Sequence, residues 1–237
     1  MHLHRFVVVD DFNTQYLRIA NPDILDQWQK VLRLKTGEQV ILVNGQSKEA
    51  LVKIINLDND FAEVEILEVR ENQNEPKVEV ILYCSILKKE NFEWVVQKAT
   101  EVGVKEIVPL ITKRTVKLNL RNERMEKIIQ EAAEQSGRGV IPLLGNPIKF
   151  EEVIKFVKNN DLNLFFDPSG ESFHKNMLPK GVKRIGVFIG PEGGWTEEEI
   201  FEAKHNDFVI VTLGNLILRA ETAAIISSYL VVNCLSC

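Results

Sequence analysis

Two nearly continuous apolar runs near the C-terminus constrain the fold more than any other feature of the chain. Residues 185–189 (IGVFI) and 208–213 (FVIVTL) are each followed by a glycine turn and then by a helical pattern. Strands that are buried on both faces have such uninterrupted apolar sequences, and they occur in parallel sheets covered by helices on both sides. This region therefore predicts the strand–turn–helix units of an α/β domain.

The alternation of strands and helices begins near residue 76. Apolar runs predict further strands, and a spacing of apolar residues near 3.6 predicts helices. The expected strands are 78–86, 106–111 and 163–166, and the expected helices are 92–102, 122–136, 151–158, 196–204 and 220–233. We therefore expect a single α/β domain over residues 73–237.

The first 75 residues have a different pattern. Short segments rich in Val and Ile and separated by Asp, Asn and Gly predict strands at 5–9, 16–19, 39–43, 50–55 and 62–69. One helical interval, 22–34, lies between them, and the polar run 71–76 looks like a linker that ends at Pro76. Residues 1–72 thus predict a small β-barrel with one inserted helix.

Composition excludes several classes of protein. The 237 residues are 45% hydrophobic and 27% charged, which is typical of a globular chain long enough to bury a core without disulfides. There is no membrane-length apolar run and no secretory signal pattern, so we expect a cytoplasmic protein. Cys234 and Cys237 form a C-x-x-C at the extreme C-terminus, where a redox role is not indicated, and the four histidines show no metal-ligand spacing.

The net charge of -5 hides a basic segment. Residues 76–150 carry 13 basic and nine acidic side chains, whereas the regions on either side are acidic. The basic residues of this segment that fall on one loop and the helix after it are Lys113, Arg114, Lys117, Arg121, Arg124, Lys127 and Arg138. They predict either a surface that contacts nucleic-acid phosphates or an ordinary solvated face.

The motif 189–195 (IGPEGGW) joins a predicted strand to a helix whose start carries Thr196 and Glu199, a capping-box pair. Glycines at such a turn let backbone amides approach a ligand, and ligands bind at the carboxyl ends of parallel strands. The alternative is a tight turn without a ligand. The glycine spacing matches neither a P-loop nor G-x-G-x-x-G, so it does not indicate a common nucleotide site.

Two further motifs carry charged residues. In 213–223 (LGNLILRAETA), Arg219 and Glu221 enter an otherwise apolar helix, either as site residues or as an ion pair at the helix start. In 131–138 (EAAEQSGR), Glu134, Gln135 and Arg138 either face a ligand or cap the helix end.

Together with residues 4–6 (HRF), 31–37 (VLRLKTG) and 97–104 (QKATEVGV), these motifs resemble the RsmE-type 16S ribosomal RNA uracil-N3 methyltransferases of the SPOUT superfamily. The resemblance spans nearly the whole chain in order. It implies an RNA-binding PUA-like barrel followed by a SPOUT α/β domain with a C-terminal deep trefoil knot. It also implies S-adenosylmethionine as cofactor, 16S rRNA in the 30S subunit as substrate, and a homodimer formed through the knotted domain.

The resemblance also implies roles for individual residues. The catalytic candidates are Arg219 and Glu221. The cofactor candidates are Phe166, Ile189, Gly190, Pro191, Glu192, Gly193, Gly194, Leu213, Gly214, Ile217 and Leu218, and the RNA-binding candidates are Arg5, Arg33, Lys98, Lys113, Arg114, Lys117 and Arg138. This chain has Leu216 where the family usually has an arginine. A SPOUT enzyme that methylates a ribose 2′-hydroxyl or another rRNA base, and a non-catalytic RNA-binding assembly factor, are the alternatives.

Overall fold

The computed structural model describes residues 3–116 and 120–234 and divides the chain into two compact units. The N-terminal unit contains Met1–Glu75 and Ala133–Ile141, and the C-terminal unit contains Pro76–Ala132 and Pro142–Cys237. No helix of the described residues is long and apolar enough to cross a membrane.

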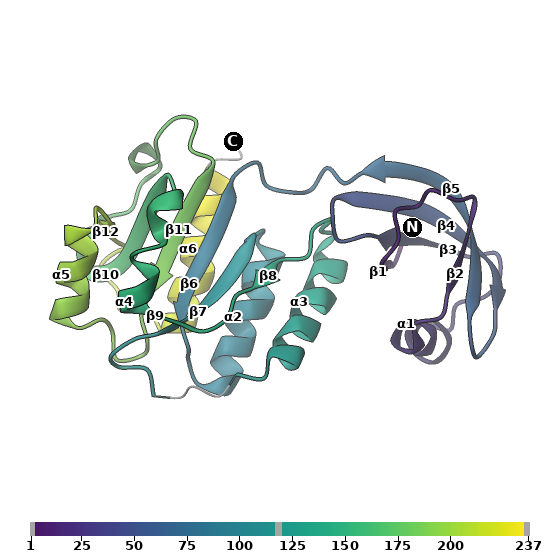
Figure 1. Cartoon of the computed structure of the whole chain (residues 1–237), viewed down its shortest axis with the longest axis horizontal. Coiled ribbons are helices and arrows are strands. Elements are labelled where there is room, and N and C mark those ends of the chain that lie inside the picture. The colour runs from purple at the N-terminus through teal and green to yellow at the C-terminus, as the bar shows by residue number, and fades with distance from the viewer. Residues whose placement is uncertain (1–2, 117–119, 235–237) are drawn as a thin grey trace. The chain divides into compact units, whose positions relative to one another are not determined.

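The N-terminal unit is built on one mixed sheet whose strands curve around an apolar core (Figure 1). Its strands are β1 (Arg5–Val7), β2 (Tyr16–Ile19), β3 (Gln39–Val43), β4 (Lys48–Leu57) and β5 (Ala62–Glu71). They pair in the order β1-β3-β4-β5-β2, with β1 parallel to β3 and the other neighbours antiparallel. Alternate residues of β4, such as Val52 and Ile54, are fully buried, as the period-two pattern requires.

The inserted helix differs from the single helix expected over 22–34. Helix α1 (Pro22–Asp26) is capped by Asn21 and continues as a π-helix (Gln27–Val31). This wider turn buries the Trp28 ring at 5.3 Å, centroid to centroid, from Phe6. Helical structure ends before Arg33, whose φ of 55° lies in the left-handed region.

Residues 72–75 of the expected linker pack within the N-terminal unit, against the end of α3 (Asn122–Ser136) and the residues that follow it. The Glu75 carboxylate accepts hydrogen bonds from the Arg138 guanidinium at 2.8 Å and from the backbone N–H groups of Gly139 and Val140 at 3.0 Å each. Glu134 accepts the N–H of Val7 at 2.9 Å. The motif 131–138 thus completes this unit.

The C-terminal unit is a seven-stranded sheet in which all neighbouring strands are parallel. Its strands are β6 (Glu79–Ser85), β7 (Glu106–Ile111), β8 (Leu143–Leu144), β9 (Ile148–Lys149), β10 (Leu162–Ser172), β11 (Arg184–Ile189) and β12 (Val209–Thr212). The order is β12-β10-β11-β6-β7-β8, and β9 also pairs with β7. The predicted parallel α/β domain is confirmed, whereas the knot itself stays a prediction.

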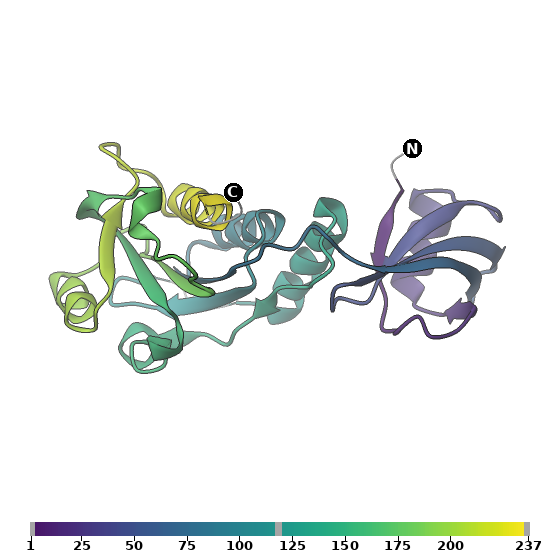
Figure 2. The same ribbon diagram turned by 90° about the horizontal axis from the view of Figure 1, so that it is seen from above.

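Helices cover both faces of this sheet. They are α2 (Lys89–Glu101), α3 (Asn122–Ser136), α4 (Phe150–Val153), α5 (Glu197–His205) and α6 (Ala220–Cys234), together with 3-10 turns at Val157–Asn159 and Lys175–Met177. Figure 2 shows α2 and α6 on one face and α4 and α5 on the other. The helix expected over 151–158 is wrong in length, because α4 ends at Val153 and only a 3-10 turn follows. The core under α4 and α5 is largely aromatic, with Phe150, Phe165 and Phe188 buried.

The Glu75–Arg138 pair gives the N-terminal unit a testable dependence on pH. Burial raises the pKa of Glu75, but the hydrogen bond and charge of Arg138 and the two N–H groups outweigh it, so the pKa lies below its ordinary value. A carboxyl group that is a stronger acid when folded stabilises the fold above its unfolded pKa. That contribution is lost as the pH falls through the lowered folded pKa.

We therefore expect Glu75→Gln to destabilise the protein by about 2 kcal/mol at pH 7, because it removes the carboxylate that pairs with the buried Arg138. The difference in unfolding free energy between Glu75→Gln and the wild type should become smaller below about pH 4.5, the ordinary pKa of the carboxyl group. Urea unfolding at several pH values measures both effects. The matched control is Glu79→Gln, which breaks a more exposed pair with Arg184 and should cost about 0.5 kcal/mol. An equal loss in the two variants would contradict the assignment.

Candidate functional site

A cavity of about 730 Å³ lies in the C-terminal unit at the carboxyl ends of β10, β11 and β12. Ligands bind at this edge of parallel sheets because the turns there can present backbone groups. The lining comes from the two predicted turns and from β10, and also from Lys88 and Asn91 at the start of α2. The motifs 189–195 and 213–223, distant in sequence, therefore meet in one site.

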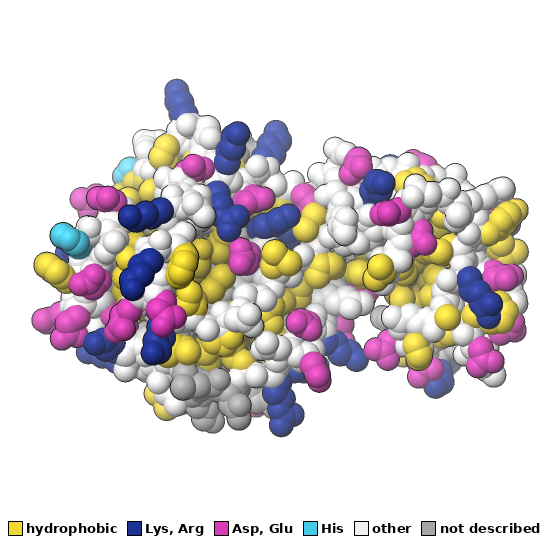
Figure 3. Space-filling model, in the orientation of Figure 1, with side chains coloured by type: hydrophobic (Ala, Val, Ile, Leu, Met, Phe, Trp, Pro, Cys, Tyr) yellow, Lys and Arg dark blue, Asp and Glu magenta, His cyan; other side chains and the backbone are white. Residues whose placement is uncertain are grey.

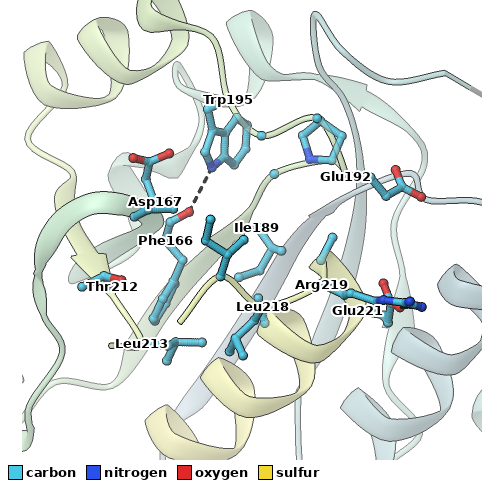
Figure 4. A pocket seen from close by; sticks show the side chains of 18 of the residues that line it. Phe166, Asp167, Ile189, Glu192, Trp195, Thr212, Leu213, Leu218, Arg219 and Glu221 are labelled. Carbon is cyan, nitrogen blue, oxygen red and sulfur yellow. Dashed lines mark hydrogen bonds and ion pairs between the residues drawn. The ribbon is translucent and has the colours of Figure 1, made fainter. Parts of the chain in front are cut away.

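One part of the cavity wall is apolar (Figure 4). Phe166 near the bulge of β10, Ile189 at the end of β11, and Leu213 and Leu218 on the turn after β12 form it. These side chains suit a flat, uncharged ring system, since pockets for small ligands are mostly apolar with a few fixed polar groups.

The turn 190–195 is held by the indole of Trp195. Its Nε1–H donates to the Phe166 carbonyl at 3.1 Å, shown as the dashed line in Figure 4, and its ring packs against Phe165 at 4.3 Å. A Cβ on Gly190 would lie 3.0 Å from the indole, closer than most Cβ contacts, so alanine here would require the ring to shift by a few tenths of an ångström. Gly194 has a φ of 70°, which also favours glycine.

The helix after this turn begins with the predicted capping box. Thr196 accepts the N–H of Glu199, and the Glu199 carboxylate accepts the N–H of Thr196 at 2.8 Å. Glu199 is buried, and its other oxygen accepts the N–H of Lys113 at 2.9 Å. Next along the chain, Arg114 donates from Nη1 to the carbonyl oxygens of Gly193 at 2.6 Å and Trp195 at 3.1 Å. Lys113 and Arg114, at the start of the β7–α3 connection, thus hydrogen-bond to the turn 190–195 and to the helix after it.

Polar and charged side chains occupy the other part of the cavity. Glu221 is only 7% exposed, and one of its oxygens has no hydrogen-bond partner among the described residues. Arg219 lies beside it in Figure 4, with Nη1 4.0 Å from the carboxylate and a side chain that is 86% exposed. Glu192 accepts the backbone N–H of Lys88 at 3.1 Å. The Asn91 amide makes no hydrogen bond within the described part of the chain.

The charges that line the cavity favour a cationic ligand. Asp167, Glu192 and Glu221 contribute three carboxylates, against the two cations Lys88 and Arg219. Burial, followed by the charges of Glu192 and Glu221, raises the pKa of the neighbouring Cys84, so this thiol stays protonated and is not a nucleophile. Among residues 3–116 and 120–234, no group of three or more His, Cys, Asp or Glu side chains is arranged to hold a metal ion.

Comparison with known proteins assigns the family. Residues 73–232 match a family described as an RNA methyltransferase domain, and residues 29–67 match an RNA methyltransferase PUA domain. The chain belongs to this RNA methyltransferase family. A relative from Mesomycoplasma hyopneumoniae, Ribosomal RNA small subunit methyltransferase E, is 36% identical over 212 residues, which cover 87% of this chain and 88% of the relative. The resemblance found in the motifs is confirmed.

Two solved structures have the same fold. A proposed methyltransferase from Legionella pneumophila, in complex with the cofactor SAM, has a TM-score of 0.87 at 31% identity and is covered to 96%, as is this chain. Ribosomal RNA small subunit methyltransferase E from Neisseria gonorrhoeae, bound to S-adenosyl methionine, has a TM-score of 0.86 at 30% identity, with 96% of this chain and 95% of that chain covered.

Most of the predicted site residues of this RNA methyltransferase lie at the cavity. Both catalytic candidates and all cofactor candidates other than Gly214 line it, and Gly214 lies in the turn that carries Leu213. Lys88 and Asn91 were missed by the sequence analysis. They follow β6 and open α2, and this strand–turn–helix arrangement, the same as in the glycine motifs, is a sequence signal that marks their position.

The RNA-binding candidates are dispersed. Arg33 is exposed in the N-terminal unit and Lys113 in the C-terminal unit, whereas Lys117 lies outside the described residues. Arg5 pairs with Glu49 at 2.8 Å and Lys98 with Glu101 at 2.7 Å. On the face of the C-terminal unit seen in Figure 3, basic and acidic side chains are interspersed.

Two further RNA-binding candidates, Arg138 and Arg114, also have partners within the protein. Arg138 is 4% exposed and its guanidinium donates to Glu75 at 2.8 Å, which disfavours a phosphate contact, and its RNA-binding role stays a prediction. A sequence cannot reveal a partner 63 residues away. Arg114 contacts the turn 190–195 through two carbonyl oxygens.

The packing of Trp195 on Gly190 predicts the effect of one added methyl group. Gly190→Ala should displace the indole, weaken its bond to Phe166 and destabilise the protein by about 1–3 kcal/mol. The matched control is Gly193→Ala, whose Cβ would meet Arg114 at an ordinary 3.4 Å. Urea unfolding of both variants tests this, and a Gly190→Ala variant as stable as Gly193→Ala would contradict it.

Proposed function

We propose that the protein is an S-adenosylmethionine-dependent methyltransferase that methylates N3 of a uridine in 16S rRNA of the small ribosomal subunit. The observation that carries the proposal is the cavity, with its apolar wall and its excess of carboxylates over cations, in a chain that belongs to the RNA methyltransferase family. An rRNA substrate would place the reaction in the cytoplasm. The names of the relatives support this substrate, and the SAM-bound neighbours support this cofactor.

The lining residues fit S-adenosylmethionine. Its adenine ring would pack on Phe166, Ile189 and Leu218, and its sulfonium would lie in the field of the carboxylates. A phosphate-bearing cofactor would instead meet three carboxylates and only two cations at the cavity wall. When bound, S-adenosylmethionine supplies an electrophilic methyl group on a positively charged sulfur.

The polar part of the cavity fits the edge of uracil that contains N3. Two carbonyl groups flank N3, so loss of its proton spreads negative charge onto their oxygens, where donors stabilise it. Arg219 and Lys88 are the cationic donors on this wall. The proton from N3 would go to the Glu221 carboxylate, which lines the cavity beside Arg219. The amide of Asn91 can both donate and accept, which suits a carbonyl next to an N–H group.

The substrate uridine must leave its stack for this edge to reach the cavity. Enzymes that modify a base take it out of the helix or act on an unpaired nucleotide. Contacts to the RNA backbone outside the cavity would hold the strand, and exposed Arg33 in the PUA region is our strongest candidate for one of them.

We also propose that two copies of the C-terminal unit form a homodimer through α2 and α6. These helices pack on each other and expose Trp94 (63%), Tyr229 (53%) and Ile226. Large apolar side chains gathered on adjacent helices mark an interface more often than a solvated face. A second copy is the partner that a symmetric interface requires.

Methylation of purified 30S subunits, followed by mapping of the modified nucleotide, tests the function. A methyl group on N3 of one uridine supports the proposal. A methyl group on a ribose 2′-oxygen or on another base would assign the enzyme to a different SPOUT reaction. No transfer, together with no thermal stabilisation by S-adenosylmethionine, would favour an RNA-binding assembly factor.

Arg219→Ala should reduce turnover by about 100-fold or more, because a donor to charge that develops in the transition state is lost. Its affinity for S-adenosylmethionine should stay near the wild-type value, since Arg219 is exposed on the polar part of the wall. Single-turnover kinetics and calorimetry measure the two quantities. Arg18→Ala, which removes an arginine stacked on Phe61 in the N-terminal unit, is the control for loss of charge. Lost cofactor binding in Arg219→Ala would contradict the assignment.

The dimer proposal predicts that Trp94→Asp combined with Tyr229→Asp yields a monomer in sedimentation equilibrium. Charges buried in an apolar interface would be strongly unfavourable. Phe201→Asp, on the exposed side of α5, is the control, and this variant should sediment with the molar mass of a dimer. A wild-type monomer at micromolar concentration would refute the proposal.

A further inference from the structure

Hydrogen bonds join the turn 190–195 to the segment 112–115, and the proposed reaction gives these bonds no role. Thr112 and Thr115 fix the segment through bonds between their own backbone and side-chain groups, the shortest of them 2.8 Å. From this rigid base the backbone of Lys113 reaches Glu199 and the side chain of Arg114 reaches Gly193 and Trp195.

Arg114 fixes the orientation of two peptide planes in the turn. The carbonyl of Gly193 and the N–H of Gly194 belong to one planar unit, and that N–H donates to the Pro191 carbonyl at 2.8 Å. The carbonyl of Trp195 shares its plane with the N–H of Thr196, which donates to Glu199. Arg114 therefore holds each plane at its carbonyl oxygen. At the N–H, the acceptor is the Pro191 carbonyl for one plane and the Glu199 carboxylate for the other.

These planes lie in the cavity wall. Gly190, Pro191, Gly193, Gly194 and Trp195 all line the cavity, so rotation of either plane would change which backbone groups face a ligand. The Arg114 stem also lies against Gly193, 3.4 Å from the position a Cβ would take. A guanidinium is suited to this task because its planar set of N–H donors can serve two carbonyl oxygens at once.

We propose that Arg114 is a positioning residue for S-adenosylmethionine, acting through the carbonyls of Gly193 and Trp195, and not a contact to RNA phosphate. The inference rests on the proposed function, because it takes this turn as part of the cofactor site. The segment that begins the basic stretch of the sequence then shapes the cofactor pocket.

The experiment compares Arg114→Ala, Arg114→Lys and Arg124→Ala with the wild-type protein. Arg124→Ala removes the same charge from an exposed position on α3. For each protein we would measure the S-adenosylmethionine dissociation constant by calorimetry, KM and kcat for methylation of 30S subunits, and the salt dependence of RNA binding. Thermal unfolding without cofactor reports folding.

Arg114→Ala should weaken S-adenosylmethionine binding and raise its KM about tenfold, equivalent to about 1.4 kcal/mol, with a much smaller change in kcat at saturating cofactor. Arg114→Lys should recover part of the affinity, and millimolar guanidinium should recover part of it in Arg114→Ala. Arg124→Ala should bind the cofactor like the wild type. If the role of Arg114 were purely structural, Arg114→Ala would have a lower unfolding temperature but would not show a raised KM with a nearly unchanged kcat.

Two results would overturn the inference. If Arg114→Ala binds S-adenosylmethionine like the wild type but shows a salt slope shallower by about one, Arg114 contacts a phosphate. If cofactor affinity and salt slope are both unchanged, the residue has neither role. Arg33→Ala should show the shallower slope and serves as the positive control for a phosphate contact. Failure of the wild-type protein to bind S-adenosylmethionine would overturn the proposed function as well, so the two failures are distinguishable.

Discussion

The buried carboxylate of Glu199 is the constraint on which the site depends. It lies at the N-terminus of α5, where the helix dipole favours negative charge, and it accepts one N–H from its own helix cap and one from the β7–α3 connection. Both acceptor oxygens are thereby used, which a buried carboxylate requires. The turn before α5 and the connection after β7 are consequently fixed relative to each other, and the Trp195 indole joins the same turn to β10. Three strands thus contribute to one rigid wall.

The electrostatics of the cavity resolve an apparent conflict in the sequence. An RNA enzyme needs cations, yet the chain carries a net charge of -5 and the cavity wall is net anionic. The two requirements apply to different ligands. A sulfonium cofactor is favoured by Asp167, Glu192 and Glu221, whereas the nucleotide needs positive charge only where its base and backbone are held. Net charge therefore carries little information about the partner.

The sequence predicted the helices and strands whose apolar residues form a recognisable pattern. The strands at 16–19, 39–43 and 106–111 and the helix at 122–136 have the expected bounds. After their first residue, the strands at 39–43 and 106–111 are continuous apolar runs, and the apolar residues of the helix recur at about 3.6 positions. The π-helix Gln27–Val31 could not be predicted, since a single i→i+5 turn adds only one residue to an otherwise helical apolar pattern. Strands β8 and β9, of two residues each, carry no periodic signal at all. Their positions follow from pairing with β7.

Charged motifs were harder to interpret than apolar ones, because a charge takes its role from its partner. The motifs at 131–138 and 213–223 both place charged residues at a helix end, yet Arg138 faces a carboxylate inside the N-terminal unit and Arg219 is left exposed at a cavity. The same reasoning applies to Leu216, an exposed apolar residue of the cavity wall at a position where the resemblance led us to expect an arginine. With that cation missing, Lys88 and Arg219 are the two basic side chains on the described wall. In the proposed reaction, Arg219 and Lys88 would therefore share the stabilisation of the charge that develops on the uracil oxygens.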